Sequence, residues 1–542
     1  MIQTLAVNLR PSCLLLLTFA SLLTACGGSS GADNTQTNAN LQPPAQNPAP
    51  NPLPDPIPDP IPDPIPEPPP VQADIDLQLQ AIIQDEGLTG DPSIGRDLPS
   101  IDDPVAQLGK TLFFSKSLGG DMDTACVSCH HPLLGGADGL SLAVGVGALN
   151  PNLMGPGRAD ADGLPDVPRN SPTVFNVGLI DSGLFWDSRV ESLTATVFQN
   201  GAAGGIWTPE SGFNTTDVNA GPNLPATQAR FPVTSEAEMK GVTFEPGSSG
   251  IAIRRHLAAR IGDYGDGAGE LSTNNWINDF QVAFSSTQDA TQLIDFNSIA
   301  FAIGEYERSM VFVDNPWFAY IGGDLDALTA QQKNGALLFY TSVDEGGGGC
   351  SNCHSGDRLT DDLFHIVAFP QIGSGKGHGP GGDSDFGRGA VSGDPREEYA
   401  FRTPSLLNIE VTAPYGHTGA YPDLDEVIDH YDGAQQNVNA FFNNEEWCDL
   451  EQFEAIPNCD DLYPNAEANS NVAINTLVAE RRAGTSLFEN FNLANQEENA
   501  LEAFLLALTD PCVLDAECLA PWIADETSDG PDGNQLNAVF NN

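Results

Sequence analysis

Apolar residues recur at helical spacing in several stretches of the chain, and long polar segments rich in glycine separate these stretches. Residues 108–114 (LGKTLFF) have the apolar face of a helix, and a second helix is indicated around residues 331–340. Residues 497–512 (EENALEAFLLALTDPC) have the pattern of an amphipathic closing helix. We therefore predict a mainly α-helical fold with long loops.

An apolar run at residues 13–23 follows Arg10 and is too short to span a membrane as a helix. It leads into Leu-Thr-Ala-Cys-Gly, which resembles a bacterial lipobox. The resemblance implies that residues 1–25 are a signal peptide and that Cys26 becomes the lipidated first residue. Because no aspartate follows Cys26, it also implies an outer-membrane lipoprotein that faces the periplasm or the cell surface. The alternative is a cleaved signal peptide with a chance cysteine.

Residues 26–72 are polar and then proline-rich, ending in PLPDPIPDPIPDPIPEPPP. Alternating prolines favour polyproline II geometry and cannot build a packed core. At about 3.1 Å per residue, residues 43–70 would extend roughly 85 Å. We interpret this segment as a tether that holds the folded part away from the membrane.

The chain has 542 residues, enough for two or three domains, and 74 acidic against 21 basic residues give a net charge of −53. This charge disfavours nucleic acid and anionic lipid as partners. It would attract a basic partner protein, although a solvated acidic surface is the simpler explanation and the one that we prefer. The only membrane contact that we expect is the lipid anchor.

Two short motifs carry the candidate chemistry: Cys126-Val-Ser-Cys129-His130 and Cys350-Ser-Asn-Cys353-His354. In each, two cysteines can form thioethers with one haem, and the following histidine can ligate its iron. A zinc half-site or a redox dithiol is the alternative for a single copy. Two copies in an exported chain favour two covalently bound c-type haems.

Four of the ten cysteines remain once the haem motifs and the two in the leader are set aside. They form two close pairs, and an oxidising compartment favours disulfides between such pairs. We predict the bonds Cys448–Cys459 and Cys512–Cys518.

Several longer motifs accompany the two haem motifs. LGKTLFF precedes the first, and RNSPTVFN (residues 169–176) and FWDSR (residues 185–189) follow it. FRTPSLLNIEVTAPYGHTGAYPDLDEVIDHYDG (residues 401–433) follows the second. Together they resemble the dihaem bacterial cytochrome c peroxidase and MauG family. The resemblance implies two cytochrome c-like haem domains, which we expect at residues 73–320 and 321–542, the first of them binding peroxide.

In the family, a segment after FWDSR forms the distal wall of the peroxide-binding haem. Here an insertion rich in Gly, Asn and Thr (residues 194–227) interrupts the pattern, which resumes with matching spacing at Gln228, Pro232 and Glu238. Heterolytic cleavage of peroxide needs a proton carrier, and a positioned carboxyl group can serve. We expect Glu238 to fill this role. In the same family, Trp186 would lie between the two haems and mediate electron transfer.

Many dihaem peroxidases block the first haem with a histidine upstream of the RNSPT-like motif. This chain has no histidine between His131 and His256, and Met154 is the only plausible soft ligand in that loop. We therefore expect the first haem to be five-coordinate through His130.

Peroxidases of this family ligate the second haem with a methionine fourteen residues after a histidine that corresponds to His417. Here that position is Tyr431, as in MauG-like members, and no methionine follows Met310. A phenolate stabilises oxidised iron, whereas a thioether raises the reduction potential. The alternatives are ligation by the neighbouring His430, and a Tyr431 that only packs.

Three further expectations concern the second half of the chain. The resemblance implies a calcium ion between the haems, bound by Asn170, Thr412 and Pro414, which offer oxygen ligands. Residues 432–486 are a longer, acidic insertion. The tail at residues 519–542 has little periodicity, and we expect it to be flexible.

Three functions follow from these observations. The resemblance implies an enzyme that reacts with hydrogen peroxide at the first haem. It would then either oxidise a partner protein, as MauG does, or take electrons from a small cytochrome or cupredoxin. Tyr431 and the missing histidine favour the first of these two. A non-enzymatic electron-transfer cytochrome is the third, and Glu238 beside an open haem argues against it.

Overall fold

The computed structural model describes residues 72–537, with side chains from residue 75 onward. These residues lie within one compact unit that begins at Pro68. The predicted signal peptide, Cys26 and the proline-rich tether fall outside the described residues. No helix among the described residues is both long enough and apolar enough to cross a membrane.

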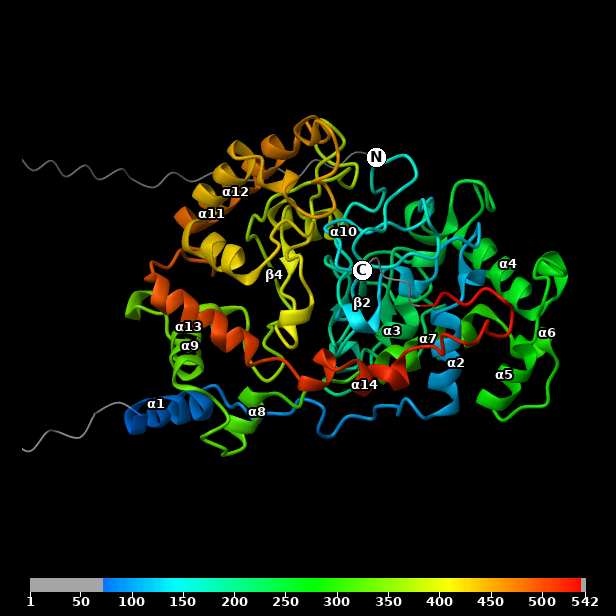
Figure 1. The fold of residues 1–542 in the computed structure, drawn as a ribbon, viewed down its shortest axis with the longest axis horizontal. Coiled ribbons are helices and arrows are strands. Elements are labelled where there is room, and N and C mark those ends of the chain that lie inside the picture. The colour runs from blue at the N-terminus through cyan, green and yellow to red at the C-terminus, as the bar shows by residue number, and fades with distance from the viewer. Residues whose placement is uncertain (1–71, 538–542) are drawn as a thin grey trace, which may run out of the picture. The chain divides into compact units, whose positions relative to one another are not determined.

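The described chain is mainly helical, with two small antiparallel sheets (Figure 1). The helices are α1 (Gln72–Asp85), α2 (Pro104–Phe113), α3 (Leu224–Gln228), α4 (Gly250–Gly262), α5 (Trp276–Ala283), α6 (Ala290–Leu293), α7 (Phe296–Arg308), α8 (Pro316–Ile321), α9 (Ala330–Tyr340), α10 (Arg388–Ser392), α11 (Leu424–Asn443), α12 (Ala466–Ala483), α13 (Asn495–Leu506) and α14 (Ala516–Leu519). The strands are β1 (Gly183–Leu184), β2 (Val190–Ser192), β3 (Ile206–Trp207), β4 (Phe364–His365) and β5 (Phe401–Arg402). The sheets are β1-β2-β3 and β4-β5.

Two helix pairs repeat the same arrangement, and in each pair one helix precedes a haem motif and the other follows it. Helix α2 packs on α7, and α9 packs on α13. Each pair meets at a glycine, because a Cβ on Gly109 would lie 1.8 Å from the Ala302 carbonyl oxygen, and one on Gly335 would lie 1.8 Å from that of Ala500. The glycines let the backbones approach closely, so each crossing depends on one small residue. The three helices predicted at residues 108–114, 331–340 and 497–512 correspond to α2, α9 and α13.

Two large hydrophobic cores form, but they do not follow the chain in order. The first is built mainly from α2, α4, α5 and α7, and the second from α9, α11 and α13. Helix α1 packs on α9 in the second core, where Lys333 pairs with Asp76 at 2.8 Å. Residues 513–536 pack in the first core. The N-terminal helix α1 therefore packs in the second core, and the C-terminal residues 513–536 pack in the first. A single boundary near residue 320 does not separate the two cores.

The tail is packed over the part that the structure describes, contrary to the expected flexibility. The Asp532 carboxylate accepts hydrogen bonds from Trp276 Nε1 (2.8 Å) and from Ser115 Oγ (2.9 Å). The Leu536 backbone donates to the Phe114 carbonyl, and Leu536 is fully buried. A few hydrogen bonds and one buried leucine, rather than a periodic apolar pattern, order this segment. The sequence pattern therefore did not predict that the segment is packed.

Both insertions are folded. In residues 432–486, α11 and α12 enclose a small core that includes Ala434, Val438 and Leu477. Disulfides join Cys448 to Cys459 and Cys512 to Cys518, the pairs that the sequence predicted. In residues 194–227, strand β3 pairs with β2, and α3 packs on α7.

Candidate functional site

Each Cys-x-x-Cys-His motif begins with a single 3₁₀ turn, Cys126–Ser128 or Cys350–Asn352. The backbone N–H of His130 donates to the Cys126 carbonyl (3.1 Å), and that of His354 donates to the Cys350 carbonyl (2.9 Å). Among the described residues, the four motif cysteines form no disulfide bond. The same local fold thus presents two thiols and one imidazole at both sites.

The imidazoles are oriented by backbone carbonyls. His130 Nδ1 lies 3.2 Å from the Gly136 carbonyl, and His354 Nδ1 lies 3.1 Å from the Leu359 carbonyl. Burial lowers the pKa of each histidine to about 4, so both rings are neutral. A neutral ring that donates through Nδ1 keeps Nε2 as the lone-pair donor for a metal.

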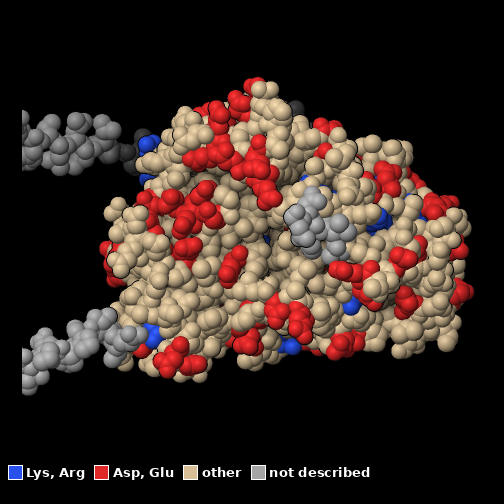
Figure 2. Space-filling model, viewed as in Figure 1, with Lys and Arg blue, Asp and Glu red and all other residues tan. Residues whose placement is uncertain are grey.

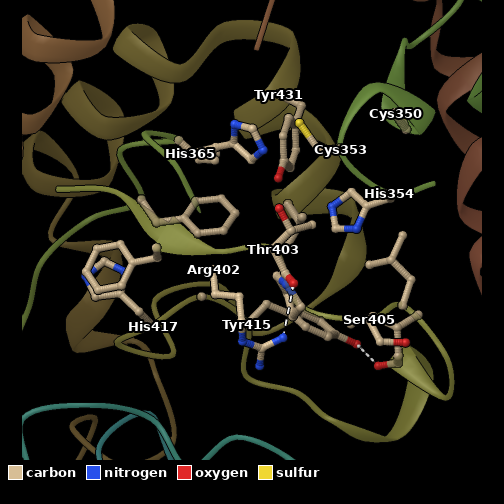
Figure 3. A pocket seen from close by; sticks show the side chains of 18 of the residues that line it. Cys350, Cys353, His354, His365, Arg402, Thr403, Ser405, Tyr415, His417 and Tyr431 are labelled. Carbon is tan, nitrogen blue, oxygen red and sulfur yellow. Dashed lines mark hydrogen bonds between the residues drawn. The ribbon is translucent and has the colours of Figure 1, made fainter. Parts of the chain in front are cut away.

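A cavity of about 270 Å³ lies beside the second motif (Figure 3). Cys350, Cys353, His354 and Tyr431 are among the residues that line it. Its volume is far more than a few water molecules require, and its walls are largely apolar. The cavity has the character of a site for a large, mostly apolar group.

Two buried nitrogen atoms of the cavity walls have no hydrogen-bond partner among the described residues. They are Arg358 Nη1 and His417 Nε2. Unpaired buried donors are costly, so they indicate a missing acceptor. The propionate groups of a haem would be such acceptors, and the cysteine pair and His354 would attach the haem and ligate its iron. The residues therefore fit a c-type haem.

Tyr431, on α11, lines the same cavity as His354. Burial, with a smaller effect of the nearby Cys353 and Cys350 thiols, raises the pKa of the Tyr431 hydroxyl well above its usual value. In Figure 3 the ring of Tyr431 and that of His354 both project into the cavity. Because burial keeps the phenol neutral, the phenolate needs a cation beside it, and a ferric iron would supply that charge.

His430, the rival axial ligand, is already fully engaged. Its Nδ1 lies 2.8 Å from the Tyr421 hydroxyl, and its Nε2 lies 2.9 Å from the Val367 carbonyl. Burial lowers its pKa to about 4, so the neutral ring accepts from Tyr421 and donates to Val367. Neither nitrogen is left to bind iron, and His430 does not line the cavity.

Trp186 lies on the wall of the same cavity, between the two halves of the chain. Its Nε1 donates to the Asn170 carbonyl (2.9 Å), and its own carbonyl accepts from the Arg402 backbone N–H (2.9 Å). Asn170, Thr412 and Pro414, the predicted calcium residues, line this cavity too. The structure brings them to one region although 242 residues separate Asn170 from Thr412 in the sequence.

A buried ionic network, which the sequence analysis missed, joins the two halves. Arg169 contacts Asp187 at 2.6 Å and Asp385 through two bonds of 2.6 and 2.9 Å. Burial by itself raises the pKa of both aspartates, but Arg169 outweighs it and the pKa of each is lowered. The motifs RNSPT and FWDSR contain two members of this network, so the motifs were its only signal in the sequence.

Glu238 lies in a single π-helical turn, Glu236–Lys240, a deviation that is frequent at functional sites. Its carboxylate is 3.9 Å from Arg189. Burial, then Asp138 and to a smaller degree Glu238, raise the pKa of the Cys129 thiol to about 12, so Glu238 lies within electrostatic range of the first haem motif. Its side chain is 28% exposed, which leaves it in reach of water.

The insertion braces the segment that carries Gln228 and Pro232. Gln228 ends α3, and Pro232 begins a 3₁₀ turn. Between them, Arg230 pairs with Asp217 (3.0 Å) and Glu210 (3.2 Å), both of which belong to the insertion. The sequence suggested only that the insertion interrupts the family pattern, whereas in the structure it supports the predicted distal wall.

Met154 is buried in the first core, with no exposed surface. The loop around it is held by Arg158, which donates to the carbonyls of Val144 (2.8 Å), Gly145 (2.8 Å) and Leu153 (2.8 Å). Met154 therefore has the surroundings of a packing residue. Nothing in the sequence indicated that Arg158, which lies in a loop rich in glycine and proline, would order this segment.

Comparisons with known proteins agree with this site. Residues 103–326 match the family model for di-haem cytochrome c peroxidase. The chain is 29% identical to the methylamine utilization protein MauG of Methylorubrum extorquens, over 60% of this chain and 67% of MauG. It is also 29% identical to the cytochrome c551 peroxidase of Pseudomonas aeruginosa, over 62% of this chain and 73% of that enzyme.

Solved structures with a similar course of the chain include a MauG-like protein associated with microbial copper homeostasis (TM-score 0.47, 21% identity, 78% of this chain and 95% of the other). Another is the dihaem peroxidase BthA of Burkholderia thailandensis (TM-score 0.46, 21% identity, 82% and 93%). The family match and the curated relatives, together with the two motifs, lead to one conclusion. Over residues 103–326 the chain matches the di-haem cytochrome c peroxidase family, which carries two c-type haems, and its curated relatives are peroxidase-type oxidoreductases.

Proposed function

We propose that this enzyme uses hydrogen peroxide to oxidise side chains of a partner protein, as MauG-like members of the family do. The observation that carries the proposal is the pair of neighbouring side chains on α11. Tyr431 projects into the cavity of the second haem motif, whereas both nitrogens of His430 are engaged elsewhere. The sequence also has no methionine after Met310 that could replace Tyr431 as a ligand.

A bound c-type haem supplies redox-active iron, and the chain tunes that iron through its axial ligands. Tyr431 would be an anionic oxygen ligand, which favours the oxidised state. A low potential suits a site that retains oxidising power for a protein substrate. It suits less well a site that must draw electrons from a high-potential carrier.

The remaining roles fall to residues around the first motif and between the halves. Glu238 would move a proton between the two oxygens of peroxide, beside the wall that carries Gln228 and Pro232. His130 would hold the first iron. Trp186, bonded to Asn170 and Arg402, would give electrons a rigid aromatic path between the sites.

The decisive experiment compares Tyr431→Phe with His430→Gln. If Tyr431 is the ligand, the Phe variant should change the low-spin electron paramagnetic resonance signal of the second haem and raise its reduction potential, whereas the Gln variant should change neither. The same variants are then tested for peroxide-dependent oxidation of a co-purifying protein by mass mapping. A spectral change in the Gln variant alone would assign the ligand to His430 and end the MauG-like proposal.

Detoxification of peroxide with electrons from a small cytochrome or cupredoxin is the second candidate. The equal identity to the Pseudomonas aeruginosa cytochrome c551 peroxidase supports it. Tyr431→Met should raise the potential of the second haem and increase turnover with a reduced cytochrome. Rapid turnover of the wild type with such a donor, unaltered by that substitution, would favour this candidate.

A calcium ion between the haems is part of the proposal. Asn170, Thr412 and Pro414 line the same cavity, and the Asn170 amide is oriented by the bond from its Nδ2 to the Leu140 carbonyl (2.8 Å). Calcium favours such carbonyl and amide oxygens. Metal analysis of the purified protein, before and after chelation, should find one calcium per chain. Its absence from active protein would remove the ion from the proposal.

The lipid anchor and the outer-membrane location are proposed from the sequence alone. Cys26 lies outside the described residues, so its lipobox-like context is the whole support. Cys26→Ser should release the protein from the membrane fraction without altering its haem spectra. Membrane association that survives this substitution would contradict the anchor.

A further inference from the structure

A surface groove of about 520 Å³ lies directly outside the cavity of the second haem motif. Residues 89–96, residues 181–182, residues 195–198 and residues 355–362 line it. Arg358 lines both the groove and the cavity, so its side chain belongs to the wall between them. The groove and the proposed site of the second haem are therefore neighbours.

Three large apolar side chains are exposed in this groove: Ile94 (70%), Val197 (63%) and Phe198 (50%). Single exposed apolar residues are normal on a protein surface. Three that gather in one concave site beside polar residues are typical of a surface that binds another protein.

Phe198 is held in position before any partner binds. The Phe198 backbone N–H donates to Asp181 (3.1 Å), and the Arg96 guanidinium lies 5.2 Å from the centre of the Phe198 ring. Arg96 itself makes two bonds to Asp181, of 3.0 and 2.8 Å. Such preorganisation lowers the entropy cost of association.

Val197 and Phe198 belong to the insertion that interrupts the family pattern. Other parts of that insertion are anchored, since β3 pairs with β2 and Asp217 binds Arg230. The insertion thus has a fixed body and an exposed apolar edge, and that edge faces the groove.

The wall of the groove is thin. Residues 355–358 follow His354 directly, and Asp357 accepts hydrogen bonds from the Thr89 backbone N–H (2.9 Å) and from the Gly90 backbone N–H (3.0 Å). Arg358 pairs with Asp362 at 2.5 Å. A protein in the groove would be separated from the cavity by little more than this loop.

The charge of the groove is negative. It contains four aspartates and two arginines. Asp181 pairs with Arg96 and Asp362 with Arg358, which leaves Asp91 and Asp357 without a cationic partner in the groove. Figure 2 shows acidic side chains over much of the visible face, and the net charge is −53. Both the local and the overall charge favour a basic partner.

We propose that this groove docks the protein that supplies electrons to the enzyme, and that this partner has an apolar contact patch ringed by lysine or arginine. The proposal rests on the proposed peroxidase function. The partner loses two electrons, and one hydrogen peroxide takes up these electrons and two protons to give two water molecules. The electrons leave the partner at the groove, beside the loop of the second haem motif.

The test uses the full-length protein with both haems and, as probes, a basic and an acidic monohaem cytochrome c. Binding is measured by calorimetry at low ionic strength, and peroxide reactivity is measured separately without any partner. The wild type should bind the basic probe and not the acidic one. Val197→Lys and Phe198→Ser should each weaken binding by about tenfold or more.

Val218→Lys is the matched control, because Val218 lies in the same insertion, is 92% exposed and does not line the groove. It should change binding less than twofold, and none of the variants should alter the reaction with peroxide alone. If Val197→Lys and Val218→Lys weaken binding equally, the effect comes from overall charge alone, and the groove is not the docking surface. If a peptide of residues 43–70 competes with the basic probe for binding, the tether is the occupant of the groove, and the docking proposal is wrong.

The possible results distinguish a failure of the proposed docking surface from a failure of the proposed function. Binding of the basic probe that depends on Val197, without peroxide-dependent oxidation of the probe, would keep the docking surface and contradict its role in electron supply. Normal oxidation of the probe by the Val197→Lys and Phe198→Ser variants would place the docking surface elsewhere, with the peroxidase function intact.

Discussion

Glu238 differs from neighbouring acids in what surrounds its carboxylate. Its side chain is 28% exposed and 3.9 Å from Arg189, whereas Glu236 is 65% exposed and pairs with Lys240. We predict that Glu238→Gln slows cleavage of peroxide by about two to four orders of magnitude, because the amide keeps the shape of the side chain but cannot carry a proton. Stopped-flow mixing with peroxide measures the rate.

Glu236→Gln is the control at the same scale and should leave the rate within about twofold, since its carboxylate faces solvent. Both variants should retain the absorption spectra of two haems. An unchanged rate in Glu238→Gln would remove this residue from the mechanism. Glu210 would not replace it, because Arg254 already binds that carboxylate at 2.6 Å.

The element that each half depends on most is the crossing of two helices, one before and one after a haem motif. At Gly335 in α9, a Cβ would lie 1.8 Å from the Ala500 carbonyl of α13. We predict that Gly335→Ala forces the helices apart, lowers the free energy of unfolding by about 1 to 3 kcal/mol, and disturbs the second haem. Denaturant unfolding, followed by helical circular dichroism and by haem absorption, measures both effects.

The matched substitution is Gly212→Ala, where the added Cβ would meet only Thr215 Oγ1 at an ordinary 3.4 Å. This variant should be as stable as the wild type. If Gly335→Ala is equally stable, the close approach of α9 and α13 does not limit the packing, and the parallel argument for Gly109 in α2 fails with it.

At the scale of the whole molecule, each terminal segment of the described chain packs in the core that the other half of the chain mainly forms. The carboxylate of Asp532 ties the tail to the first core through Trp276 and Ser115. We predict that Asp532→Ala destabilises the first core by about 1 to 3 kcal/mol, because it leaves a buried indole N–H without an acceptor. Asp529→Ala, at an exposed neighbouring position, should have almost no effect.

Thermal unfolding monitored at the two haems separates the consequences. The loss of Asp532 should shift the transition of the first haem at least as much as that of the second, although residue 532 follows the second motif in sequence. A shift confined to the second haem would mean that the tail serves the domain nearest to it in the chain.

The chemistry that depends on neighbouring residues was determined by the sequence alone. Cys126, Cys129 and His130 lie within one turn of backbone, and so do Cys350, Cys353 and His354, so their spacing alone predicts haem attachment without a fold. The three predicted helices are also local, since an apolar stripe needs only periodicity. The two disulfides close loops short enough to be inferred from spacing in the same way.

Tertiary structure decided everything that depends on contacts between distant residues. His430 and Tyr431 are adjacent, and only the positions of Tyr421 and Val367 show which of them is free to face the cavity. Arg169 meets Asp385 across 216 residues. The exchange of α1 and the tail between the cores, and the groove formed by four separate segments, likewise leave no local pattern, because burial and ion pairing over such distances are properties of the packed chain.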